Sequence, residues 1–108
     1  MKAATFSALA EPHRLSILDL LRKRGPLPVG EIADKLALNQ PQTSKHIRVL
    51  SDAGLVEVQP IANKRIYRLR TEPLQEVDEW LNHFRQLWEK RLDRLDDYLM
   101  DLQRNTDS

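Results

Sequence analysis

The stretch that decides the fold is Gln40-Pro41-Gln42-Thr43-Ser44-Lys45-His46-Ile47-Arg48-Val49-Leu50. Asn39, a good N-cap residue, stands directly before this stretch. Pro41 then falls in the first helical turn, where a missing N–H is tolerated. Gly54 follows it and can end a helix. We therefore predict a helix from Gln40 to about Asp52.

The two faces of this helix differ in chemistry. Thr43, Ile47 and Leu50 recur at i, i+4 and i+7, so they form the inward stripe. The other face carries polar and basic side chains, namely Gln42, Ser44, Lys45, His46 and Arg48. Gln can pair with adenine, Lys can reach guanine or a phosphate, and Ser and His suit phosphates. No carboxylate lies between residues 35 and 51, which suits a face turned toward nucleic acid.

Helical periods also precede this stretch. Residues 3–10 form a short, weak period, and residues 12–24 form a leucine-rich one that Pro12 opens and Gly25 closes. Pro26 and Pro28 predict an extended connector, after which residues 29–36 give two further helical turns. The order is thus helix, short helix, turn, helix.

A hairpin is predicted after Gly54. Leu55, Val56 and Val58 lead to a proline, and residues 65–70 alternate basic and apolar side chains. These patterns indicate two short antiparallel strands joined by residues 61–64, with Asn63 as the residue best able to take a positive φ. Together, these elements predict a mainly α fold with a β-hairpin, a winged helix-turn-helix, whose second helix in the turn enters the DNA major groove.

The last segment predicts one long helix over residues 72–103. Apolar side chains recur at spacings of three and four, close to a heptad seam: Leu74, Val77, Leu81, Phe84, Trp88, Leu92, Leu95, Leu99 and Leu102. Such a helix is roughly 45 Å long, more than a body of this size covers. We expect a second copy of the chain to cover the remainder. The alternative is a helix that packs only along its own domain.

Composition and charge limit the classes of function. The chain has 108 residues, no cysteine and no apolar run long enough to span a membrane, so we expect one cytoplasmic domain over residues 1–108. The net charge is +1, but residues 11–70 hold 11 basic and 6 acidic side chains, whereas residues 71–108 hold 5 and 10. This asymmetry suggests an anionic partner for the body, although a chance difference between solvated faces gives the same pattern. No nucleophile–base pair or Gly-rich phosphate loop indicates an enzyme, so no catalytic residue is assigned.

The chain resembles the ArsR-type (ArsR/SmtB-like) winged-helix transcriptional repressors of bacteria. The resemblance covers residues 5–70 and rests on the segments 9–18, 29–33, 40–50 and 53–56, with an S-x-H-[LI]-x-x-L core at Ser44 to Leu50. It implies a homodimer formed by the first and last helices that binds an inverted-repeat operator on double-stranded DNA and represses transcription. The long Trp-containing last helix is similar to that of the autorepressor-like subgroup.

The resemblance and the helical wheel together give two sets of candidate residues. The DNA-binding set lies on the helix and at the tip of the hairpin: Gln40, Gln42, Thr43, Ser44, Lys45, His46, Arg48, Asn63, Lys64 and Arg65. The dimerisation set lies on the first and last helices: Phe6, Leu9, Leu74, Val77, Trp80, Leu81, Phe84, Trp88 and Leu95. His46 has an alternative role, in which it hydrogen-bonds locally and only fixes the helix.

The metal ligands that the family is known for are missing. Many members use a Cys-x-Cys on the helix before the recognition helix, where this chain has residues 31–35 without a thiolate. Others use paired His and carboxylate ligands in the last helix, where this chain has only His83 with Asp78 and Glu79. Pooling of His83 across a dimer remains an alternative. We expect a repressor without metal, cofactor or metal sensing, its small-molecule effector being unknown; the competing class is a protein-interaction module.

Overall fold

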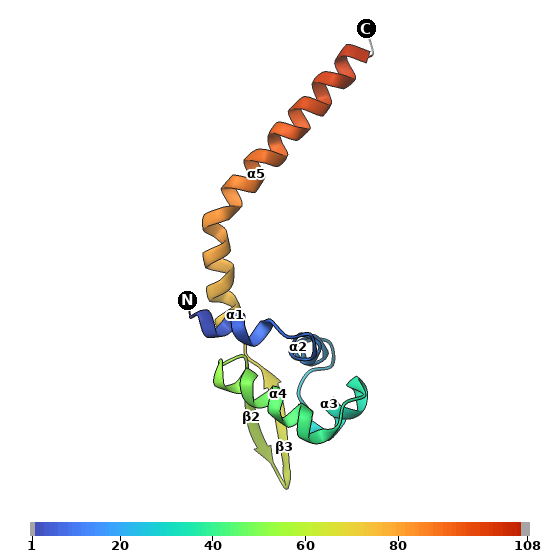
Figure 1. Ribbon diagram of the computed structural model, residues 1–108, viewed down its shortest axis with the longest axis vertical. Coiled ribbons are helices and arrows are strands. Elements are labelled where there is room, and N and C mark those ends of the chain that lie inside the picture. Colours follow the sequence, from blue (N-terminus) through green and yellow to red (C-terminus); the bar gives the residue numbers. More distant parts are fainter. Residues whose placement is uncertain (1, 107–108) are drawn as a thin grey trace. The chain divides into compact units, whose positions relative to one another are not determined.

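The computed structural model describes residues 2–106, apart from the side chains of Leu92 and Thr106. The chain divides into two compact units, Met1–Glu76 and Val77–Ser108. The first unit contains α1 (Ala3–Leu9), α2 (Pro12–Arg24), β1 (Leu27–Pro28), α3 (Val29–Leu36), α4 (Gln40–Asp52), β2 (Val56–Ile61) and β3 (Lys64–Leu69) (Figure 1). The helix α5 (Glu72–Thr106) begins in the first unit and forms the second. The predicted mainly α fold with a hairpin and a long last helix is confirmed.

The predicted bounds of α2 and α4 are confirmed because local signals fix both ends. The Glu11 carboxylate accepts a hydrogen bond from the Arg14 N–H and caps α2, while Asn39 Oδ1 accepts one from the Gln42 N–H at 2.8 Å and caps α4. Each helix has proline in its first turn. Gly25 has a φ of +80°, which permits the sharp exit from α2 that a residue with a Cβ resists.

The core of the first unit joins the helices to the sheet. Its fully buried side chains come from α2, α3, α4 and the start of the hairpin: Ile17, Ile32, Thr43, Leu50 and Leu55. Ile47 is also buried, so the predicted inward stripe of α4 is confirmed in full. Burial of this stripe fixes which face of α4 remains exposed.

The sheet has three antiparallel strands in the order β1-β3-β2. The connector at Leu27–Pro28 is extended as predicted, and it also pairs with Ile66 and Tyr67 of β3. The strands of the hairpin are longer than expected, because Ile61 and Lys64 pair with each other and leave only Ala62 and Asn63 in the loop (Figure 1). The positive φ of 55° falls on Ala62 and not on Asn63, so that prediction is wrong. A positive φ at the first of two central residues is the pattern of a type II′ hairpin turn.

The second unit consists of α5 from Val77 onward. The helix extends to Thr106, three residues beyond the predicted end. Many of its large apolar side chains are exposed, among them Phe84, Trp88 and Leu95. None of the helices in the described range is both long enough and apolar enough to cross a membrane.

Candidate nucleic-acid interface

The polar face of α4 is presented to solvent by the burial of its opposite face. Five of the seven candidate residues on this helix are exposed: Gln40, Gln42, Ser44, Lys45 and Arg48. Among the described residues, no carboxylate lies within ion-pair distance of Lys45 or Arg48. Both cationic groups are therefore available to an anionic partner.

Thr43 does not belong to this face. Its side chain is fully buried, with 0% of its surface exposed, and its hydroxyl donates a hydrogen bond to the Asn39 carbonyl at 2.9 Å. Its position in the i, i+4, i+7 stripe already placed it inward, and that position decides its role. The prediction that Thr43 contacts DNA is corrected: it holds the first turn of α4 on the core.

His46 lies between the exposed face and the body. Its side chain is 22% exposed, and its Nδ1 atom is 3.6 Å from Glu11 Oε2, longer than a hydrogen bond but close enough for an ion pair when the imidazole is protonated. This contact favours the alternative in which His46 fixes the helix, and a DNA contact through this residue stays a prediction.

The tip of the hairpin carries the second group of candidates. Asn63, Lys64 and Arg65 are exposed, and neither Lys64 nor Arg65 has an ion pair within the described part of the chain. The basic residues nearer the body differ from them, because Arg68 Nε lies 3.0 Å from Glu57 Oε1 and Arg70 lies near both Glu57 and Glu72. Unpaired positive charge on the hairpin is thus located at the tip.

Arg70 is held by two neighbouring carboxylates. Its pKa lies above the ordinary value because the guanidinium donates a hydrogen bond to Glu72 and feels the charges of Glu72 and Glu57. The pKa of Glu72 is lowered by its own backbone N–H and then by Arg70. Arg70 is therefore engaged within the body and is a poor candidate for a DNA contact.

Sequence reasoning missed one group of titratable side chains. Glu11, His13 and His46 lie together, with His13 Nδ1 at 3.0 Å from Glu11 Oε1. Partial burial raises the pKa of Glu11, but hydrogen bonds from the Arg14 N–H and His13 outweigh it and lower the pKa overall. The spacing of Glu11 and His13 is visible in the sequence, whereas their contact with His46 depends on how α2 and α4 pack.

The dimerisation candidates are divided between the two units. In the first unit, Phe6, Leu9 and Leu74 are half-buried, and Leu9 and Leu74 pack against the core. In the second unit, Val77 and Leu81 are half-buried, whereas the larger residues Trp80, Phe84, Trp88 and Leu95 are exposed. The seam residue Leu92 has a side chain outside the described set.

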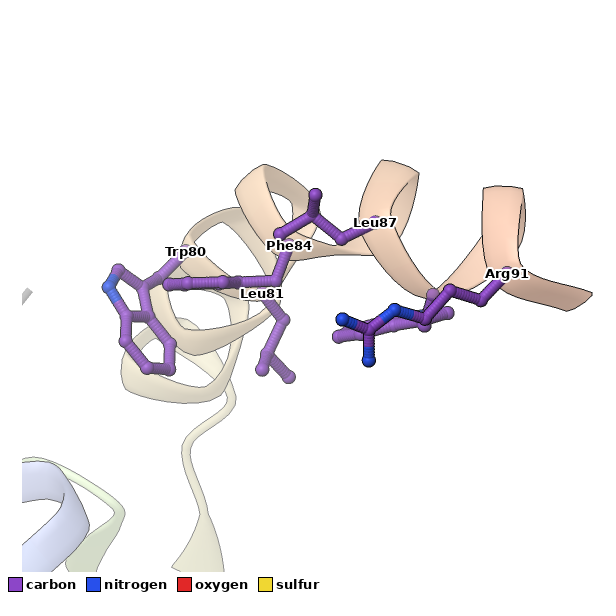
Figure 2. A pocket seen from close by; sticks show the side chains of 6 residues that line it. Trp80, Leu81, Phe84, Leu87 and Arg91 are labelled. Atoms are coloured by element: carbon purple, nitrogen blue, oxygen red, sulfur yellow. The ribbon is translucent and has the colours of Figure 1, made fainter.

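Aromatic side chains gather on one face of α5. The rings of Trp80 and Phe84 meet edge to face with centroids 4.9 Å apart. Figure 2 shows Trp80, Leu81, Phe84, Leu87 and Arg91 around a hollow of about 330 Å³, which Trp88 also lines. An apolar surface of this kind is typical of a protein–protein contact.

Comparisons with known proteins place the chain in a family. The Helix-turn-helix domain family matches residues 9–59. The HTH-type transcriptional regulator NmtR of Mycobacterium tuberculosis is 40% identical over 82 residues, 75% of this chain and 68% of that protein. The transcriptional repressor SdpR of Bacillus subtilis is 33% identical over 73% of this chain and 87% of its own length.

Solved structures with a similar fold are also transcriptional regulators. A crystal structure of an ArsR family transcriptional regulator is 35% identical and superimposes with a TM-score of 0.69 over 80% of this chain and 88% of that chain. An ArsR-like transcriptional regulator from Rhodococcus sp. RHA1 is 27% identical, with a TM-score of 0.71 over 86% and 87% of the two chains. Regulators of this family bind DNA through the helix-turn-helix that α3 and α4 form here. The chain belongs to the ArsR family of winged helix-turn-helix transcriptional regulators.

Proposed function

We propose that the protein is a homodimeric repressor that binds an inverted-repeat operator and occludes it. The observation that carries the proposal is the location of the unpaired cations. Lys45 and Arg48 on α4, and Lys64 and Arg65 at the wing tip, are exposed and have no ion pair within the described residues. These are the two elements that a winged helix applies to DNA.

The division of labour follows from the residue types. Gln42 is exposed near the start of α4, where a recognition helix contacts base edges, and its amide can pair with adenine. Lys64 and Arg65 suit phosphates or the minor groove, contacts that contribute affinity for every sequence. A two-fold dimer whose recognition helices stand about 34 Å apart reads two successive major grooves on one DNA face.

Dimerisation is supported by the apolar face of α5. Phe84, Trp88 and Leu95 are between 40% and 51% exposed in the single chain. Large apolar side chains left in water on one helix face favour association, and a second copy offers the same face in a two-fold arrangement. We propose α1 and α5 as the dimer interface.

Selection of genomic fragments by the purified, metal-free protein tests the function. We expect recovery of a symmetric sequence, with an affinity that falls steeply as salt rises. Gln42→Ala should change the preferred sequence, and Lys64→Ala should weaken binding to operator and random duplex alike. Failure to shift any DNA fragment at low salt would refute the repressor and leave the protein-interaction module.

Sedimentation of a matched pair of variants tests the dimer. Trp88→Asp places a charge in the apolar face, so we expect monomers and loss of tight operator binding. Gln86→Asp adds the same charge about half a turn away, on an exposed polar position of α5, and should leave the dimer intact. A Trp88→Asp variant that sediments as an unchanged dimer would contradict the proposed interface.

A further inference from the structure

Three potential metal ligands converge where the start of α2 meets α4. Glu11 is the N-cap of α2, His13 is the second residue of that helix, and His46 lies in the middle of α4. One ligand atom from each lies within 4.8 Å of the others, and no other described residues form a comparable group of three. All three belong to the first unit.

The distances fit a shared ion. Two ligand atoms bound to zinc at about 2.1 Å with tetrahedral angles stand about 3.4 Å apart. In the structure, His13 Nδ1 is 3.0 Å from Glu11 Oε1, and His46 Nδ1 is 3.6 Å from Glu11 Oε2. The two imidazole centroids are 5.4 Å apart, and a pair of zinc-bound imidazoles brings its centroids to roughly 5 Å. The broad χ2 torsion of histidine leaves each ring free to turn toward a shared ion.

The chemistry of the donors selects the class of ion. Two imidazoles and one carboxylate suit zinc and its first-row neighbours, whereas magnesium and calcium prefer oxygen ligands alone. The carboxylate is essential here, because an ion at this place also meets the positive end of the α2 dipole. Glu11 can cap α2 and bind an ion at the same time. Each of its carboxylate oxygens has two lone pairs, and the Arg14 N–H uses only one lone pair of Oε2.

The site is open to solvent on one side and supported on the other. The side chain of His13 is 52% exposed, whereas those of Glu11 and His46 are 26% and 22% exposed. Arg14, the nearest cation in sequence, is held away, because its guanidinium donates hydrogen bonds to the carbonyls of Ala8 and Ser7. An ion can therefore reach the three ligands from water, with water in the remaining coordination positions.

From this geometry we propose that Glu11, His13 and His46 form a binding site for a divalent first-row transition-metal ion such as Zn²⁺. The site differs from a thiolate pair and from ligands on the last helix, the two arrangements whose absence led to the expectation of no metal. It connects the N-terminus of α2 with the recognition helix through three side chains.

Titration of the chelator-treated full chain with ZnCl₂ tests the proposal. We expect saturation at one ion per chain. The imidazole ¹⁵N signals of the three histidines are the direct readout, and those of His13 and His46 should shift while those of His83 stay in place. Absence of saturable binding, or a shift of His83 together with the other two, would overturn the proposed site. MgCl₂ should produce no shift.

Variants test the ligand set. His13→Ala removes an exposed ligand, and Glu11→Gln removes the charge while its amide oxygen can still cap α2. Each should weaken zinc binding at least about tenfold, since even changes behind the ligands cost that much in known sites. His83→Ala is the matched control and should bind zinc as the unaltered chain does. Unchanged affinity in both ligand variants would overturn the assignment even if the protein binds zinc elsewhere.

Discussion

Replacing Lys64 by Ala should reduce the salt dependence of DNA binding, whereas replacing Arg68 by Ala should not. Both residues belong to β3, both are exposed, and each substitution removes one positive charge. They differ in their surroundings, because Arg68 Nε lies 3.0 Å from Glu57 Oε1 and Lys64 has no ion pair within the described residues. The two variants therefore separate unpaired charge at the wing tip from charge already neutralised within the hairpin.

The magnitude follows from counterion release. Each phosphate that a protein neutralises contributes about 0.9 to the slope of log K against log salt concentration. Lys64 occurs twice in the proposed dimer, so Lys64→Ala should make this negative slope shallower by about 1.8. Between about 50 and 200 mM salt, the unaltered protein should then lose roughly 12-fold more affinity than the variant does. Addition of Arg65→Ala should double the change in slope.

Fluorescence anisotropy with an operator duplex and a random duplex, at several salt concentrations, measures both slopes. We expect the Lys64→Ala slope to fall by the same amount on the two duplexes, because phosphate contacts carry no sequence information. Equal reductions for Lys64→Ala and Arg68→Ala would refute the reasoning, since net charge alone would then explain the effect. No change for either variant would exclude the wing tip from the interface.

Three further predictions concern stability and are measured by thermal or urea unfolding. Gly25→Ala should destabilise the protein by about 1–3 kcal/mol, because Gly25 has φ +80° and ψ −165°. Gly30→Ala in α3 should stabilise the protein by up to about 1 kcal/mol, since a Cβ there meets nothing within 4 Å. A Gly25→Ala variant more stable than Gly30→Ala would contradict the backbone argument. Leu50→Ala should cost about 2–5 kcal/mol because Leu50 is 0% exposed. The pKa of Glu72 is lowered below its ordinary value of 4.5 by its own backbone N–H and by Arg70. Its contribution to stability is therefore present above pH 4.5 and is lost as the pH falls through the lowered pKa. Glu72→Gln should reduce the fall in the free energy of unfolding over this acidic range.

The helices could be predicted from the sequence because their signals are local. The bounds of α4 depend on Asn39 and the proline that follows, and its orientation depends on the spacing of Thr43, Ile47 and Leu50. The same reasoning placed α2 between Pro12 and Gly25. Capping and periodicity act within a few residues, so they can be recognised without the rest of the fold.

Contacts between distant segments could not be predicted in the same way. The pairing of Leu27–Pro28 with β3 makes a strand of a segment whose two prolines predict only an extended connector. The strained position in the hairpin falls on Ala62 because strand register, and not residue preference, decides where the turn lies. The approach of His46 to Glu11 likewise requires α2 and α4 to be packed together.

The ion pairs of the hairpin refine the meaning of the charge asymmetry. Glu57 lies against both Arg68 and Arg70, and Arg70 also contacts Glu72, so these two guanidinium groups are neutralised within the body. A count of basic residues over 11–70 therefore overstates the charge that DNA would meet. Cations without an ion pair in the described part of the chain lie at the end of the wing and along α4, the two elements proposed to contact the duplex. If this distribution governs binding, Arg70→Ala should lower the free energy of unfolding and leave DNA affinity nearly unchanged. Lys64→Ala should lower DNA affinity and leave the free energy of unfolding nearly unchanged.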